Sequence, residues 1–102
     1  MKISIDKKED GIRFAIEGEV DENGAQVLKE TFRSEYTEAF KKVAFDFSKV
    51  THIGSAGIGK LLLFYKDVAM NGGILEIDNV SPVIYDLFLT LKLDTVFSLK
   101  KA

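Results

Sequence analysis

The chain has 102 residues, of which 46% are hydrophobic and 29% are charged, and its formal net charge is -2. This length suits one domain, and this balance excludes an intrinsically disordered chain, which combines low hydrophobicity with high net charge. The absence of a basic patch excludes a nucleic-acid binder. We therefore expect residues 1–102 to form a single domain whose partners do not include nucleic acids.

The chain contains no cysteine, which excludes disulfides, thiolate metal sites and a cysteine nucleophile. Its first residues are too polar for a signal peptide. No apolar run approaches the roughly 18 residues that a membrane span needs. We therefore expect a cytoplasmic protein without a membrane partner.

The N-terminal residues predict a β-hairpin. Ile3 and Ile5 alternate with polar neighbours, and the same alternation returns over Ile12–Ile16, which is the period of a strand. The segment Lys7–Gly11 supplies a turn between them. Gly18 is expected to end the second strand.

A helix and a strand follow. Asp21 is a suitable N-cap for a helix over Glu22–Glu35. The helix has an apolar stripe of Ala25, Leu28 and Phe32. Alternating apolar residues over Val43–Phe47 predict a central strand, with Asp46 near its end. A short β-prone run over Val50–Ile53 comes next.

The strongest helical periodicity covers about Ala56–Met70, and Asn71–Gly73 is expected to stop that helix. Its predicted buried residues are Ile58, Leu61, Leu62, Tyr65, Val68 and Ala69. Ile74–Ile77 predicts another strand.

A third helix is predicted to begin with Ser81 as N-cap and Pro82 as its first residue. Its predicted buried side consists of Val83, Ile84, Leu87, Phe88 and Leu91. Val96–Leu99 predicts a last strand. The order β-β-α-β-α-β-α-β indicates an α/β domain with a mixed sheet of four to five strands and three main helices.

The glycine-rich segment Gly54–Lys60 joins a strand to the long helix. In the plainest interpretation Ser55 caps the helix through its side chain. Glycine inside a helix costs about 1 kcal/mol relative to alanine, so Gly57 and Gly59 indicate a packing or contact requirement. The same segment matches the P-loop pattern G-x-x-x-x-G-K, but Leu61 follows where Ser or Thr would bind Mg²⁺. Nucleotide binding by Gly54–Lys60 therefore stays a minor alternative.

A third interpretation comes from a family resemblance. Val43–Val50, Ile53–Gly59 and Leu61–Leu62 resemble the core of the STAS domain of bacterial anti-sigma-factor antagonists. In that family the helix opens with D-S-S-G or D-S/T-x-G, then an apolar residue and glycine. Gly18–Asp21 resembles the family's G-x-[LIV]-D, and Asn71–Gly73 resembles its N/R-G-G, so the resemblance covers nearly the whole chain.

The resemblance places the family's phosphorylated serine on Ser55. Gly54 stands where the family usually has aspartate, and Ala56 where a second serine is common, so Ser55 would be the only acceptor in the motif. The resemblance implies a monomer without enzymatic activity, cofactor or metal. It implies two partners, an anti-sigma factor that is also a serine kinase and a phosphatase that resets the switch. The expected partner-binding residues are Asp21, Gly54, Ser55, Ala56, Gly57, Ile58 and Gly59.

Other polar residues favour structural roles. His52, the only histidine, is expected to be packed or hydrogen-bonded, because no second ligand is spaced to join it in a metal site. Asp46 is expected to cap a loop. Glu76 and Asp78 should share a solvated strand face, and the three tyrosines should lie at the edge of the core.

Two classes of binding module remain open besides the nucleotide-binding alternative. One is the antagonist switched off by phosphorylation of Ser55. The other is a STAS accessory subunit that binds a transport ATPase or a signalling assembly without phosphorylation.

Overall fold

The computed structural model describes residues 1–102 and begins with the predicted hairpin. Strands β1 (Lys2–Lys7) and β2 (Gly11–Val20) pair antiparallel, with Ile3 opposite Ile16. The turn between them is closed by mutual backbone hydrogen bonds of Lys8 and Gly11. The hairpin therefore follows from the alternation and the turn residues seen in the sequence.

The remaining chain alternates helices and strands. These elements are α1 (Glu22–Glu35), β3 (Lys42–Ile53), α2 (Ser55–Met70), β4 (Ile74–Val80), α3 (Pro82–Thr90), the short 3₁₀ helix η1 (Leu93–Thr95) and β5 (Ser98–Lys101). The sheet order is β1-β2-β3-β4-β5, and all pairs after the hairpin are parallel. The predicted mixed sheet with three helices is confirmed. None of the helices is long and apolar enough to cross a bilayer.

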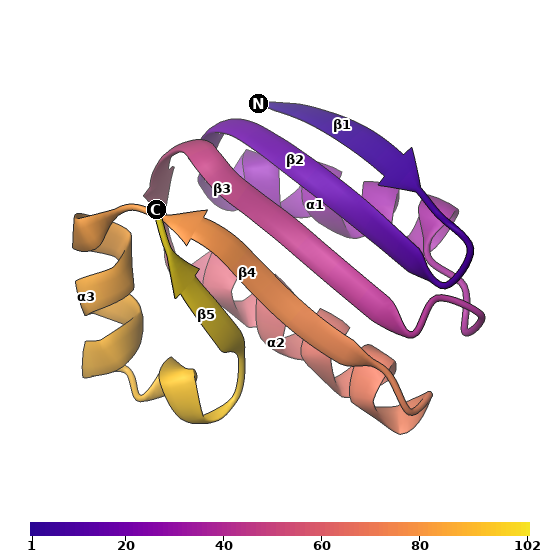
Figure 1. Ribbon diagram of the computed structural model, residues 1–102. Helices are drawn as coiled ribbons and strands as arrows, with labels where there is room; N and C mark the ends of the chain where they lie inside the picture. Colours follow the sequence, from indigo (N-terminus) through magenta and orange to yellow (C-terminus); the bar gives the residue numbers. More distant parts are fainter.

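One face of the sheet carries the core, and α1 and α2 cover that face (Figure 1). Aromatic rings join the layers: Phe14 stacks on Phe45 with centroids 5.1 Å apart, and Phe32 of α1 stacks on Phe64 of α2 at 4.1 Å. These side chains are buried. The contact between Phe32 and Phe64 therefore packs the two helices against each other above the sheet.

The opposite face of the sheet carries a charged network. Arg13 of β2 forms an ion pair with Asp78 at 2.7 Å and a longer one with Asp46 at 3.5 Å. Asn79 donates a hydrogen bond to Asp46 Oδ1 at 3.0 Å, and its backbone is left-handed, with φ 55°. The network thus joins β2, β3 and β4 and holds the end of β4 in an unusual conformation.

The structure corrects the predicted roles of these acidic residues. Asp46 lies in the middle of β3 and bonds across the sheet, so the prediction of a loop cap at a strand end is wrong. Glu76 and Asp78 do share a face, but it is only partly solvated. Asp78 pairs with Arg13, while Glu76 accepts from Lys100 at 3.4 Å.

Two strands are longer than predicted. β2 continues past Gly18 to Val20, because Gly18 adopts φ 106° within the strand instead of ending it. β3 is continuous to Ile53, and it absorbs two extra residues where the register with β2 shifts. Such bulges change which residues face the core. The alternation of apolar residues is therefore interrupted, and the sequence predicted two separate segments, Val43–Phe47 and Val50–Ile53.

The predicted buried stripes of two helices are partly wrong. In α2, Leu62 is 38% exposed and Ala69 is exposed, whereas Phe64 is buried. The run Leu61–Tyr65 is apolar throughout, so periodicity alone does not orient it. In α3 only Ile84 and Phe88 are buried, because the helix lies beside β5 at the margin of the sheet (Figure 1). Val83, Leu87 and Leu91 are exposed. The tyrosines lie at the edge of the core, as predicted.

The charged network predicts a pH-dependent contribution to stability. Burial raises the pKa of Asp46, but hydrogen bonds from Asn79 and Ser48 and the charge of Arg13 outweigh it, so the pKa lies below its usual value. Asp46→Asn keeps an acceptor oxygen and removes the charge. We expect it to lower the free energy of unfolding by about 1 kcal/mol at pH 7.

Because the folded-state pKa of Asp46 is lowered, its charge stabilises the fold above the unfolded-state value of about 4 and stops doing so as the pH falls further. Urea unfolding of wild type and Asp46→Asn at several pH values between 7 and 3 checks this. The difference between the two proteins should shrink below about pH 4. A difference that stays constant over the whole range would contradict the assignment.

Candidate functional site

The carboxyl ends of β2, β3 and β4 lie at one edge of the sheet, and each strand leads directly into a helix there (Figure 1). In open α/β sheets, ligands bind at this edge. The N-cap residues of the three helices are Asp21, Gly54 and Ser81. Parallel pairing therefore brings the predicted site residues of the first and second helices to the same edge.

The three helix starts differ in how they are capped. Asp21 Oδ1 accepts a hydrogen bond from the Gly24 amide at 2.7 Å, and Ser81 Oγ accepts one from the Ile84 amide at 3.5 Å. Gly54 offers no side chain to α2. The prediction that Ser55 caps this helix is wrong, because Ser55 is its first helical residue. Its exposed side chain is thus not used as a cap.

The start of α2 is held directly against the ends of two strands. The Gly54 amide donates to the Val20 carbonyl at 3.0 Å. A Cβ atom at Gly57 would lie 2.7 Å from Val20 Cγ1 and 2.9 Å from Ile53 Cγ1, which is closer than carbon atoms can approach without displacement. Only glycine at position 57 therefore lets α2 begin at this distance from the sheet.

The other predicted contact residues form a surface around Ser55. Asp21, Ser55 and Gly59 are exposed. Gly54, Ala56 and Ile58 are partly buried. Gly57 is buried against Val20 and Ile53, so the structure places it beneath this surface. Gly59 has no neighbour within 4 Å of a Cβ position and presents bare helix backbone.

An open hollow of about 480 Å³ lies beside Ser55. It is lined by Asp21, Glu22, His52, Gly54, Ser55 and Ala56. Glu22 and His52 were not among the predicted site residues, since nothing in their spacing indicated a shared surface. His52 is exposed at the end of β3 and is not packed as predicted. The hollow is walled by two carboxylates on the α1 side and by an imidazole on the β3 side.

The geometry of Gly54–Lys60 argues against a P-loop. A P-loop binds phosphate with backbone amides of an open loop that precedes its helix. Here the helix begins at Ser55, and the Ile58 amide already donates to the Gly54 carbonyl at 3.1 Å. Gly57 is buried, and the side on which its Cβ would stand faces Val20 and Ile53. No phosphate cradle is therefore formed by this segment.

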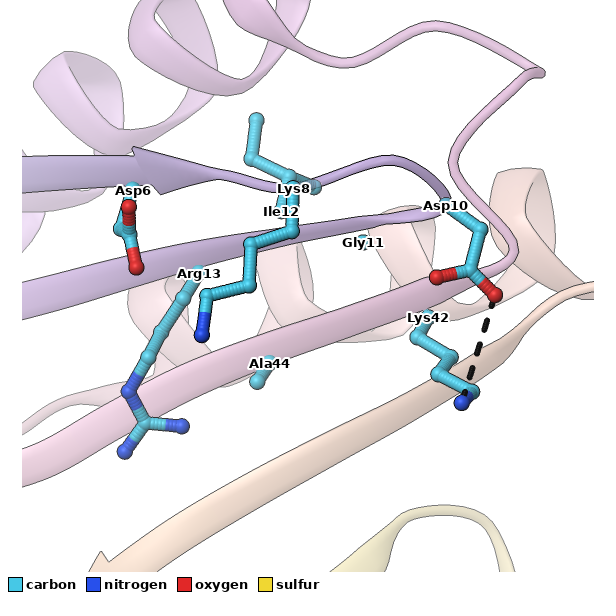
Figure 2. A pocket seen from close by; sticks show the side chains of 8 residues that line it. All are labelled: Asp6, Lys8, Asp10, Gly11, Ile12, Arg13, Lys42 and Ala44. Atoms are coloured by element: carbon cyan, nitrogen blue, oxygen red, sulfur yellow. Dashed lines mark ion pairs between the residues drawn. The ribbon is translucent and has the colours of Figure 1, made fainter.

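A second hollow, of about 290 Å³, lies at the amino ends of β2 and β3 and is shown in Figure 2. Its charged groups are partly neutralised by near neighbours. Lys42 pairs with Asp10 at 4.0 Å, and Arg13 pairs with Asp78 on the open face at 2.7 Å. It lies at the opposite ends of the strands from Ser55 and contains none of the predicted site residues.

The two helical glycines predict opposite responses to alanine. Gly57→Ala forces a methyl group against Val20 and Ile53, and overpacking of this kind costs about 1–3 kcal/mol. Gly59→Ala meets open space and should raise the free energy of unfolding by about 0.5–1 kcal/mol through helix propensity. Urea unfolding of the two variants beside wild type measures both effects. Equal stability changes would show that Gly57 is not a packing requirement.

Solved structures of similar fold span nearly the whole chain. A putative anti-sigma factor antagonist from Thermotoga maritima is 16% identical, with 98% of this chain and 86% of that chain covered and a TM-score of 0.89. An anti-sigma factor antagonist from Mycobacterium paratuberculosis is 19% identical, with 99% and 86% covered and a TM-score of 0.86.

The Bacillus cell fate determinant SpoIIAA in its phosphorylated form is 15% identical, with 96% of this chain and 90% of that chain covered and a TM-score of 0.76. At such identities these similarities establish a shared fold. The family itself is shown by the model of the STAS domain, which matches residues 2–102. The chain belongs to the STAS domain family.

Proposed function

We propose that this STAS domain is an anti-sigma-factor antagonist that binds an anti-sigma factor with serine kinase activity, and that phosphorylation of Ser55 switches this binding off. The observation that carries the proposal is the position of Ser55. It is exposed as the first residue of α2, at the edge where Asp21 and Gly59 are also exposed. Structural neighbours described as anti-sigma factor antagonists support it.

The modification is compatible with the fold. The kinase would transfer the γ-phosphoryl group of ATP to Ser55 Oγ, with release of ADP and the hydroxyl proton. The product carries about -1.5 to -2 charge at neutral pH. A helix N-terminus favours an anion by about 0.3–1 kcal/mol, and Ser55 is exposed, so the phosphate needs no rearrangement of the core.

The interface is where the phosphate would act. A partner packed over Ser55 and the bare backbone of Gly59 must desolvate the side chain at position 55, which is a hydroxyl before modification and a phosphate after it. Asp21 and Glu22 line the same hollow, so the new charge is added beside two carboxylates. A charge buried without a partner costs several kcal/mol, and reversing a 99:1 binding equilibrium takes about 5.5 kcal/mol. Phosphorylation of one serine can therefore switch binding.

The cycle needs two further proteins. The unmodified chain would hold the anti-sigma factor and so release the sigma factor for transcription. A phosphatase would hydrolyse the phosphoserine and restore the binding form. This cycle assigns the chain a binding role, with the chemistry carried out by its partners.

Titration calorimetry with candidate anti-sigma kinases from the same genome measures the effect of charge at position 55. Wild type and Ser55→Ala should bind with similar affinity, because neither carries charge at position 55. Ser55→Asp should bind at least tenfold more weakly, because a buried carboxylate imitates part of the phosphate charge. With ATP, mass spectrometry should find phosphate on Ser55 of the wild type.

Ser34→Asp is the matched control, since Ser34 is exposed near the end of α1, far along that helix from Asp21. It should bind like wild type. If Ser55→Asp binds as well as wild type and Ser55 stays unmodified, the antagonist function is wrong. Binding to a transport ATPase or signalling assembly without phosphorylation would then be the function to test.

A further inference from the structure

His52 and Ser55 face the same hollow from the two sides of Gly54. Both residues line it, and both are exposed. A Cβ atom at Gly54 would lie 4.0 Å from His52 Nε2 and has nothing closer. The imidazole nitrogen therefore lies over a residue without a side chain, and the space between the imidazole and the start of α2 is open.

Three acidic side chains lie around His52, and the N-terminal residue Met1 lines a neighbouring hollow with two of them, Glu19 and Asp21. Glu19 of β2 is the register neighbour of His52 in the parallel pair. Asp21 and Glu22, at the start of α1, line the hollow with it, and Asp21 Oδ1 already accepts from the Gly24 amide. None of the five ion pairs in the structure involves His52. It is the only lining side chain that can carry positive charge.

A phosphate on Ser55 would enter this acidic hollow, and one side chain is available to bind it. We propose that His52 is that residue: its imidazolium pairs with the phosphoserine at position 55 and holds it over Gly54. This inference rests on the proposed function, in which Ser55 is the phosphoacceptor. His52 thereby adds a specific side chain to a phosphoserine site otherwise surrounded by carboxylates.

The pairing has a consequence near neutral pH. Free imidazole titrates near pH 6.5 and the second phosphate proton near pH 6, so both charges are present together between these values. A nearby cation favours the phosphate dianion and moves its titration to lower pH. The carboxylates of Glu19, Asp21 and Glu22 act in the opposite direction. The contribution of His52 is therefore isolated by comparing variants that share those three residues.

The experiment uses the full chain with phosphoserine incorporated at position 55 during translation, so no kinase is needed. The ³¹P chemical shift is followed from pH 4.5 to 8.5 in wild type and His52→Gln. The midpoint should lie about 0.2–0.7 pH unit lower in wild type, the size expected of a partly exposed ion pair. High salt should reduce this difference.

Gly54→Asp is the second variant. It places a carboxylate beside His52 Nε2 and is made both with His52 and with His52→Gln. The new carboxylate repels the phosphate in both proteins, but it competes for an imidazolium only where His52 is present, so the midpoint difference between the two should shrink. Equal midpoints in wild type and His52→Gln, within 0.1 pH unit, would overturn the inference. That result would leave the antagonist function standing, because kinase modification and loss of binding are measured separately. A shifted midpoint without modification by any kinase would overturn the function instead.

Discussion

The close contact of Gly57 with Val20 and Ile53 sets the position of everything at the carboxyl edge of the sheet. A methyl group at this glycine would lie 2.7 Å and 2.9 Å from their side chains. Because Gly57 has no such methyl group, α2 begins directly at the ends of β2 and β3, and the Gly54 amide donates a hydrogen bond to the Val20 carbonyl. Further along the helix, Phe64 then lies above the sheet, stacked on Phe32. The surface around Ser55 and the core thus both depend on how closely α2 approaches the ends of β2 and β3.

The surface around Ser55 is bare for a different reason. Gly54 and Gly59 carry no side chains, and neither meets a close neighbour that would exclude one. Their smallness is not required by packing, in contrast to that of Gly57. Exposed glycine in a helix costs stability, so Gly59 is better explained by close approach of another molecule. This division between one packing glycine and two surface glycines connects the fold to the proposed binding function.

Element order and type were predictable, because hydrophobic periodicity, caps and glycine stops agree with one another along the chain. The carboxyl edge was predictable too, since it follows from parallel pairing. The strand register and the orientation of the helices were harder to predict. The bulges in β3 shift which side chains face inwards after Phe47, and an apolar run through Leu61–Tyr65 gives α2 no single orientation. Such features depend on tertiary packing and leave no periodic signal.

The candidate site was predicted as one continuous segment with Asp21, and the structure places further residues beside it. Position 55 and its neighbours follow from a local motif, whereas His52 and Glu22 join them only through the fold. The burial of Gly57 could not be predicted from the local sequence either, because a helical pattern does not distinguish a glycine at position 57 from one at position 59. Only the contacts with Val20 and Ile53 separate their roles.

In the proposed function the partner binds at the start of α2. The amides of Ser55 and Ala56 precede the first intrahelical bond, which Ile58 donates, and neither residue is buried, so they should exchange with solvent quickly in the free chain. Hydrogen exchange with and without the bound anti-sigma factor tests the claim. Protection should arise at residues 54–60 and near Asp21. Protection confined to β1 or to the charged face of Arg13, with the start of α2 unchanged, would contradict it.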